Sequence, residues 1–232
     1  SFRAPSIENI NYSLTGNILP EKTEVAEAEF GYTLTRKMIL TANLFDITTK
    51  DPIIYYGISD EEQGYGEAEA TGSRGVEVDY RFKDTWGFVN VNYAFYTAQG
   101  KYRLETYEVP DVPSFHLAFP AHKINLNANY KITKDLSVNP SVWFRGKRYG
   151  YDSYDDSTGE YLIKEFEPSL FFNMFVHYER KNFHAGIGVY NLLNQEMMLI
   201  QPYNSYHAPL PGPSREIVVK LGYNFNFKKK EK

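Results

Sequence analysis

Long stretches of this chain alternate apolar and polar residues with a period of two. In 216–227 the odd-numbered residues are all apolar, and the even-numbered ones are Glu, Lys, Gly and Asn apart from Val218. The pattern recurs in eight other segments, which are 24–32, 38–47, 75–82, 87–97, 123–132, 135–145, 169–179 and 183–191, the first two less cleanly. This period is typical of a β-strand with two different faces. The sequence therefore predicts about nine strands, most of them 8–12 residues long.

The connections between these segments alternate between short and long. The short ones are polar hairpin turns, near 33–37 and at 83–85, 133–135 and 179–182. The long ones lie at about 48–73, 97–121, 146–167 and 191–214. This order is typical of an up-and-down meander that carries only turns at one rim and elaborate loops at the other. Because long loops are uncommon inside a compact domain and are usually functional, we expect function at the loop rim.

Two all-β folds fit the alternation. A soluble β-sandwich also alternates apolar and polar residues. A membrane barrel does so because each strand presents an apolar face to lipid and a polar face to the lumen, and its tilted strands need roughly 9–11 residues to cross the bilayer. Strand length, loop asymmetry and polar faces rich in Asn, Lys and Glu favour the barrel. We predict an all-β fold, an antiparallel up-and-down transmembrane β-barrel.

Composition narrows the picture further. The 232 residues include 20 Tyr and 16 Phe but 2 Trp and 4 Met, and such enrichment favours strands. The net charge of -4 is mild, so no strong field points to nucleic acid and no phosphate-binding face is evident. The absence of Cys fits an exported protein that needs no disulfides. No run approaches the ~18 apolar residues of a membrane helix. The chain starts without Met or a signal segment and reads as a mature form or a piece of something longer.

Seven segments carry motifs that occur together, in this order, in one protein family. They are SFRAPSIENI (1–10), LPEKTEVAEAEFGY (19–32), LFDITTKDPIIYY (44–56), GSRGVEVDY (72–80), FPAHKINLNANY (119–130), GVYNLLNQEM (188–197) and APLPGPSREIVVKLGYNFNF (208–227). Together they resemble the C-terminal part of a TonB-dependent outer-membrane receptor. The resemblance implies a complete barrel of about 22 strands with a plugged lumen. Residues 1–232 would supply its last nine or ten strands, and the plug domain and TonB box would lie upstream, outside this chain.

The resemblance also implies a function. A receptor of this kind captures a scarce, bulky nutrient outside the cell and imports it with energy from TonB, and a ferric siderophore or other iron chelate is the expected ligand. A SusC-like importer of glycans, a surface barrel or adhesin without transport, and a soluble lectin remain as alternatives. The implied partners are outer-membrane lipid, the rest of the barrel, the plug, and the TonB complex through the upstream region. Long loops would be extracellular and short turns periplasmic.

One long loop has the residue types expected of a ligand site. Segment 145–161 combines three cations with four tyrosines. Cations and aromatic faces hold an anionic aromatic chelate by stacking and charge-assisted hydrogen bonds, and aromatic faces also stack on sugar rings. A membrane-interface belt of tyrosines is the alternative, but it does not account for those deep inside a long loop. The candidate ligand-binding residues, including three from two other loops, are Arg145, Arg148, Tyr149, Tyr151, Tyr154, His116, Tyr203 and His207.

Other chemistry is not indicated. The segment GIGVYN lacks the third glycine and the strand–turn–helix context of a dinucleotide site. His177 and His184 flank one turn without the further ligands that a metal site needs. The acidic segment 152–160 lacks the spacing of an EF-hand. We therefore predict no enzyme activity, no cofactor and no metal site.

Overall fold

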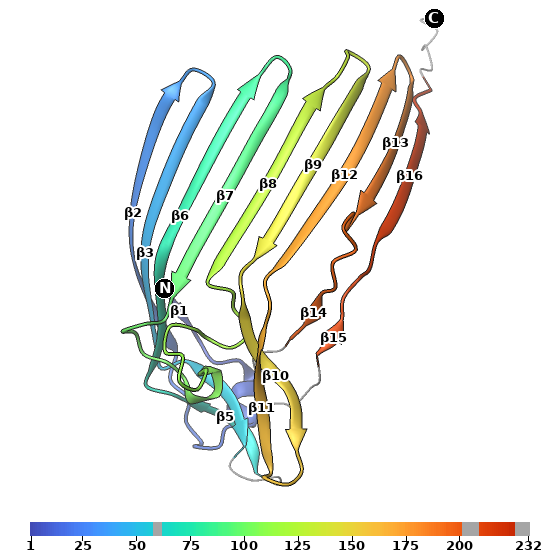
Figure 1. The fold of residues 1–232 in the computed structure, drawn as a ribbon. Helices are drawn as coiled ribbons and strands as arrows, with labels where there is room; N and C mark the ends of the chain where they lie inside the picture. Colours follow the sequence, from blue (N-terminus) through green and yellow to red (C-terminus); the bar gives the residue numbers. More distant parts are fainter. Residues whose placement is uncertain (58–61, 201–208, 226–232) are drawn as a thin grey trace, which may run out of the picture.

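The computed structural model describes residues 1–57, 62–200 and 209–225, and most of these form one ten-stranded antiparallel sheet. The strands, in their order across the sheet, are β1 (Phe2–Arg3), β2 (Glu21–Thr35), β3 (Met38–Lys50), β6 (Ala70–Asp84), β7 (Gly87–Thr97), β8 (His122–Lys131), β9 (Leu136–Arg145), β12 (Ser169–Arg180), β13 (Phe183–Tyr190) and β16 (Glu216–Tyr223). Their order in space follows their order in the chain, so the sheet is an up-and-down meander (Figure 1). All nine strands expected from the alternation are present. The fold is confirmed as antiparallel all-β, in the form of a partial barrel.

The two rims of the sheet differ as the connection lengths predict. One rim, here called the turn rim, carries tight turns at 36–37, 85–86, 132–135 and 181–182. The opposite rim, the loop rim, carries the long connections 51–69, 98–121, 146–168 and 191–215. Figure 1 shows the turns gathered at the top of the sheet and the long connections folded together at the bottom. Two of the expected turns were two to three residues too wide, because β2 continues to Thr35 and β12 to Arg180.

The pairing register places the apolar residues of neighbouring strands side by side on one face. One row crosses seven strands through Phe30, Ala42, Val78, Tyr93, Ile124, Phe144 and Leu170. Phe30 and Leu170 of this row are exposed, its other residues are partly exposed, and Leu221 on the same face in β16 is 73% exposed. A soluble monomer rarely exposes a patch of this size. We call this side of the sheet the apolar face.

The opposite side, the polar face, carries the charged and amide side chains. The row next to the one above runs through Glu29, Asn43, Glu77, Ala94, Lys123, Arg145 and Ser169. Nearer the turn rim the face is lined by amides, and Asn129 donates to the Asn139 side-chain oxygen at 2.7 Å. Directly opposed residues share a face, so a shift of the pairing by one residue would have placed polar residues in the apolar row. The sheet thus has one side that is apolar between the rims and one side that is mainly polar, with aromatic rings such as Trp143 and Phe171 among its polar residues.

The long connections contain structure that the alternation did not predict. Three hairpins lie within them, formed by β4 (Ile53–Gly57) with β5 (Gln63–Glu67), β10 (Arg148–Asp155) with β11 (Glu160–Phe166), and β14 (Met198–Leu199) with β15 (Leu210–Pro211). These strands are short or lack a clean apolar face, so a search for period two does not find them. A one-turn helix α1 (Ile7–Asn11) and a 3-10 turn η1 (Glu105–Tyr107) complete the elements. No helix in the described ranges is long and apolar enough to cross a membrane.

The last strand is shorter than predicted. We expected it to run to Phe227, but β16 ends at Tyr223, and Asn224 and Phe225 follow outside any strand. Phe227 lies outside the described residues. The backbone N–H of Asn224 still donates to the carbonyl oxygen of Asn182 at 2.8 Å. Within the described part of the chain, β16 pairs with β13 alone, which leaves it as one edge of the partial barrel.

Candidate functional site

Two long connections pack together at the loop rim. Segment 98–121 has its own small core of Val109, Phe115, Leu117 and Ala121, and Leu117 is 1% exposed. The β10–β11 hairpin packs on this core through Tyr149, whose ring meets that of Phe115 edge-on at 5.1 Å. The backbone N–H of Ala118 also donates to the Tyr149 carbonyl oxygen at 2.7 Å. These contacts join the two long connections at the loop rim.

A pocket of about 550 Å³ lies where segment 98–121 meets the polar face. Its aromatic and charged lining residues are Phe45, Glu77, Phe95, Tyr96, Tyr107, His116, Phe119 and Lys123. Hydrogen bonds hold its walls, since the Tyr96 hydroxyl donates to the Phe119 carbonyl oxygen at 2.9 Å. His116 Nε2 lies 3.0 Å from the Gly72 carbonyl oxygen, to which it donates in the tautomer that carries a proton there. An apolar pocket with a few convergent polar groups is the usual form of a small-molecule site.

A basic cluster lies beside this pocket on the same face. Lys123 of the pocket wall is directly opposite Arg145 in the sheet, and Arg145 is opposite Ser169. Arg148, at the start of β10, lies close enough to Arg145 for the two guanidinium groups to repel each other. Arg148 is 5% exposed, and this burial lowers the pKa of its guanidinium. The pocket and the cluster adjoin each other at Lys123, and we call the two together the rim site.

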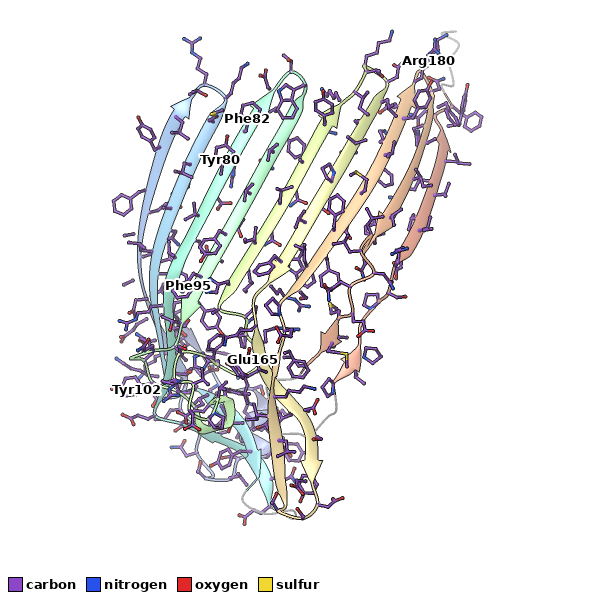
Figure 2. All side chains as sticks on the ribbon, in the orientation of Figure 1. Tyr80, Phe82, Phe95, Tyr102, Glu165 and Arg180 are labelled. Atoms are coloured by element: carbon purple, nitrogen blue, oxygen red, sulfur yellow. The ribbon has the colours of Figure 1, made fainter. Side chains whose placement is uncertain are left out.

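Tyr149 takes part in a separate surface cluster. Its hydroxyl donates to Glu165 Oε2 at 2.5 Å, and Lys147 Nζ donates to the same oxygen at 3.1 Å. The hydrogen bond to the carboxylate raises the pKa of Tyr149 and lowers that of Glu165, while Glu165 raises the pKa of Lys147. Figure 2 shows Glu165 on the hairpin at the loop rim, with Arg180 at the opposite rim. This cluster ties the base of β10 to β11.

The other predicted residues are spread over the hairpin. Tyr151 packs against the small core of segment 98–121, as Tyr149 does. Tyr154 is 42% exposed and lies near the tight turn at 156–159, away from the hairpin base. Tyr203 and His207 lie outside the described residues. The fold therefore brings Arg145 and Arg148 together, places His116 in the adjoining pocket, and sets Tyr154 apart.

A family model describes most of this architecture. The TonB dependent receptor-like β-barrel model matches residues 1–192. The chain belongs to this family. The family consists of transport receptors of the outer membrane, and its barrel accounts for the meander, the two rims and the two faces. No relative was found among curated protein sequences.

Solved structures of siderophore receptors share the fold. The ferric-catecholate import receptor Fiu of E. coli K12 matches with a TM-score of 0.69 and 19% identity. The match covers 96% of the present chain and 30% of the Fiu chain. The siderophore receptor PirA of Acinetobacter baumannii matches with a TM-score of 0.70 and 14% identity over 90% and 32%. The ferripyoverdine receptor of Pseudomonas aeruginosa, bound to ferripyoverdine, matches with a TM-score of 0.67 and 14% identity over 90% and 28%. The chain thus spans about 30% of the length of these receptors.

Several residues of the rim site escaped the sequence analysis. Lys123 and Tyr96 belong to predicted strands, and only loop residues were considered for binding, whereas Phe119 lies in a predicted loop but was not chosen. Lys123 and Phe119 stand in the segment FPAHKINLNANY, which had been used for the family resemblance alone. The signal that could have identified Lys123 was its position, since it is a charged residue on the polar face of a strand at the end nearest the long loops. Ser169 gave no such signal, because a serine at the start of a strand is common.

Proposed function

We propose that this chain forms the C-terminal part of the barrel of an outer-membrane receptor that imports a ferric chelate with energy from TonB. The family match and the siderophore receptors of the same fold support this proposal. The remaining strands, the plug and the TonB box would belong to the complete receptor. They would cover the polar face and pair with the two edges that the partial barrel leaves open.

The two faces supply the orientation. The apolar face would contact lipid, since a bilayer is the phase in which such an exposed apolar surface is stable. The polar face would then line the lumen and contact the plug. The loop rim would be extracellular, because receptor barrels of this kind have short periplasmic turns and longer extracellular loops. The rim site would therefore lie inside the barrel at its outer mouth.

The observation that carries the proposal is the composition and place of the rim site. Aromatic rings surround a pocket of about 550 Å³ on the polar face, and three cations adjoin it. A ferric chelate with aromatic or anionic iron-binding arms would be held by stacking and by charge-assisted hydrogen bonds. Two structural neighbours are described as a ferric-catecholate import receptor and as a receptor bound to ferripyoverdine.

Uptake of radioactive iron tests the function directly. The gene for the complete receptor is deleted, and the cells are starved of iron and supplied with ⁵⁵Fe as a tris-catecholate, a tris-hydroxamate, ferric citrate or ferripyoverdine. We expect the deletion to abolish uptake of one of these chelates, and a protonophore or loss of TonB to do the same in cells with the receptor. Unchanged uptake of all four contradicts the proposal. A growth defect on oligosaccharides instead would identify a glycan importer.

A further inference from the structure

Four polar atoms of the basic cluster have no hydrogen-bond partner within the described residues. They are Arg145 Nε, Arg145 Nη2, Arg148 Nε and Ser169 Oγ, and all four are shielded from solvent. Among the described residues, the Arg148 side chain has one hydrogen bond, a long one from Nη2 to the Met198 carbonyl oxygen at 3.5 Å. Buried donors in proteins are nearly always paired, and an unpaired buried charge is especially costly. The cluster therefore needs an acceptor that the described chain does not supply.

The missing acceptor has a definite chemical character. In the described part of the chain, Lys123, Arg145 and Arg148 form no ion pair with a carboxylate, although Lys147 and Lys164 on the same hairpin each have one. Two guanidinium groups that repel each other are stabilised best by an anion between them. Paired oxygens match the fork of an arginine, and the Ser169 hydroxyl would donate to a further oxygen.

The surroundings favour an anion carried by a ligand. Arg145 lies over the ring of Trp143 at 4.1 Å, and Trp143 packs on Phe171 at 5.3 Å, so an aromatic wall fixes the guanidinium from one side. Lys123, on the neighbouring strand, belongs both to the cluster and to the wall of the aromatic pocket. A bulky ligand in the pocket would therefore have its anionic end beside Lys123 and Arg145.

We propose that Arg145, Arg148 and Ser169 form a binding site for an oxygen anion of the transported ligand, a carboxylate or a catecholate. The inference rests on the proposed function, and it narrows the ligand to an anionic chelate. Because the donors are shielded, the surrounding side chains or loops must rearrange to admit the anion.

The site has its own fluorescent reporter in Trp143. The probe is iron-free citrate, titrated into the purified complete receptor in detergent at an ionic strength held constant with NaCl. The signal of Trp143 is the difference between the wild type and Trp143→Phe. We expect a saturable change whose midpoint rises about 10- to 100-fold in Arg148→Gln, since each charged hydrogen bond lost weakens binding by a factor in this range. Lys164→Gln, which removes an equal charge from an exposed position on the same hairpin, keeps the wild-type midpoint.

The outcomes separate this inference from the proposed function. A missing Trp143 response, or an equal midpoint in Arg148→Gln, overturns the anion site even if the receptor imports iron. If Arg148→Gln lowers the melting temperature of the ligand-free receptor and citrate does not bind, an internal carboxylate fills the site and the inference is wrong. A saturable response that Arg148→Gln weakens upholds the site, and failure of ⁵⁵Fe uptake in the same receptor then refutes the proposed function alone.

Discussion

Substitution of arginine for Leu126 tests the assignment of the two faces. Leu126 lies on the apolar face, between Val91 of β7 and Val142 of β9. β8 has 10 residues, and at about 3.4 Å per residue and a tilt of about 40° it rises roughly 26 Å, close to the ~25 Å height of a barrel's apolar band. As the fifth residue of β8, Leu126 would lie near the bilayer midplane. Arginine there costs about 2–4 kcal/mol, which reduces the folding equilibrium constant about 30- to 700-fold.

The neighbouring residue supplies a matched control. Asn127 lies on the polar face, opposite Asn90 and Ser141, so Asn127→Arg adds the same side chain away from lipid. We expect its effect on stability to be within about 0.5 kcal/mol. Both variants of the complete receptor are refolded into lipid vesicles and unfolded with guanidinium, and the folded fraction is measured by its heat-modifiable gel migration. If Asn127→Arg costs as much as Leu126→Arg, or Leu126→Arg costs nothing, the face assignment is wrong.

Two further substitutions test packing at the loop rim. Gly75→Ala should lower the free energy of unfolding by about 1–3 kcal/mol, because the new Cβ would overlap a backbone carbonyl oxygen of β7, which cannot rotate away. In the control Gly31→Ala, the Cβ meets nothing within 4 Å, so the free energy of unfolding should change by less than about 1 kcal/mol in the same denaturation assay. Lys101→Met should speed chymotrypsin cleavage of the adjoining loop several-fold, since it removes the ammonium that binds the Asp46 carboxylate, whereas equal cleavage rates would show that this ion pair does not hold the loop.

The sheet was predictable from the sequence because its faces meet two different environments. Every membrane-spanning strand must keep one face apolar along its whole length, so each segment shows the alternation by itself. The row through Val78, Tyr93 and Ile124 can be predicted from the alternation within each strand and the meander order of the strands. The strand ends were less certain, because outside the apolar band either face tolerates polar residues. The expected end of the last strand at Phe227 illustrates this.

The loop structures were not predictable in the same way. The β10–β11 hairpin alternates Tyr with Gly, Asp and Ser, so its two faces differ little in polarity. What positions it is the packing of Tyr149 and Tyr151 on the small core of segment 98–121. That contact joins parts of the chain more than 25 residues apart, and no local pattern encodes it. The sequence therefore predicted the residue types of the hairpin but not its contacts.

The rim site depends on both kinds of information. Arg145 and Arg148 were chosen as ligand-binding residues from their place in a long loop, and that part of the hypothesis remains to be tested. Their relation to Ser169 and Lys123 comes from the sheet register, which sets three strands side by side at the level where the loops begin. The unpaired donors arise where this rigid row meets the hairpin. A site held by strands on one side and by a loop on the other combines groups fixed by the sheet with groups carried by a connection, and loops on a rigid scaffold often carry binding residues.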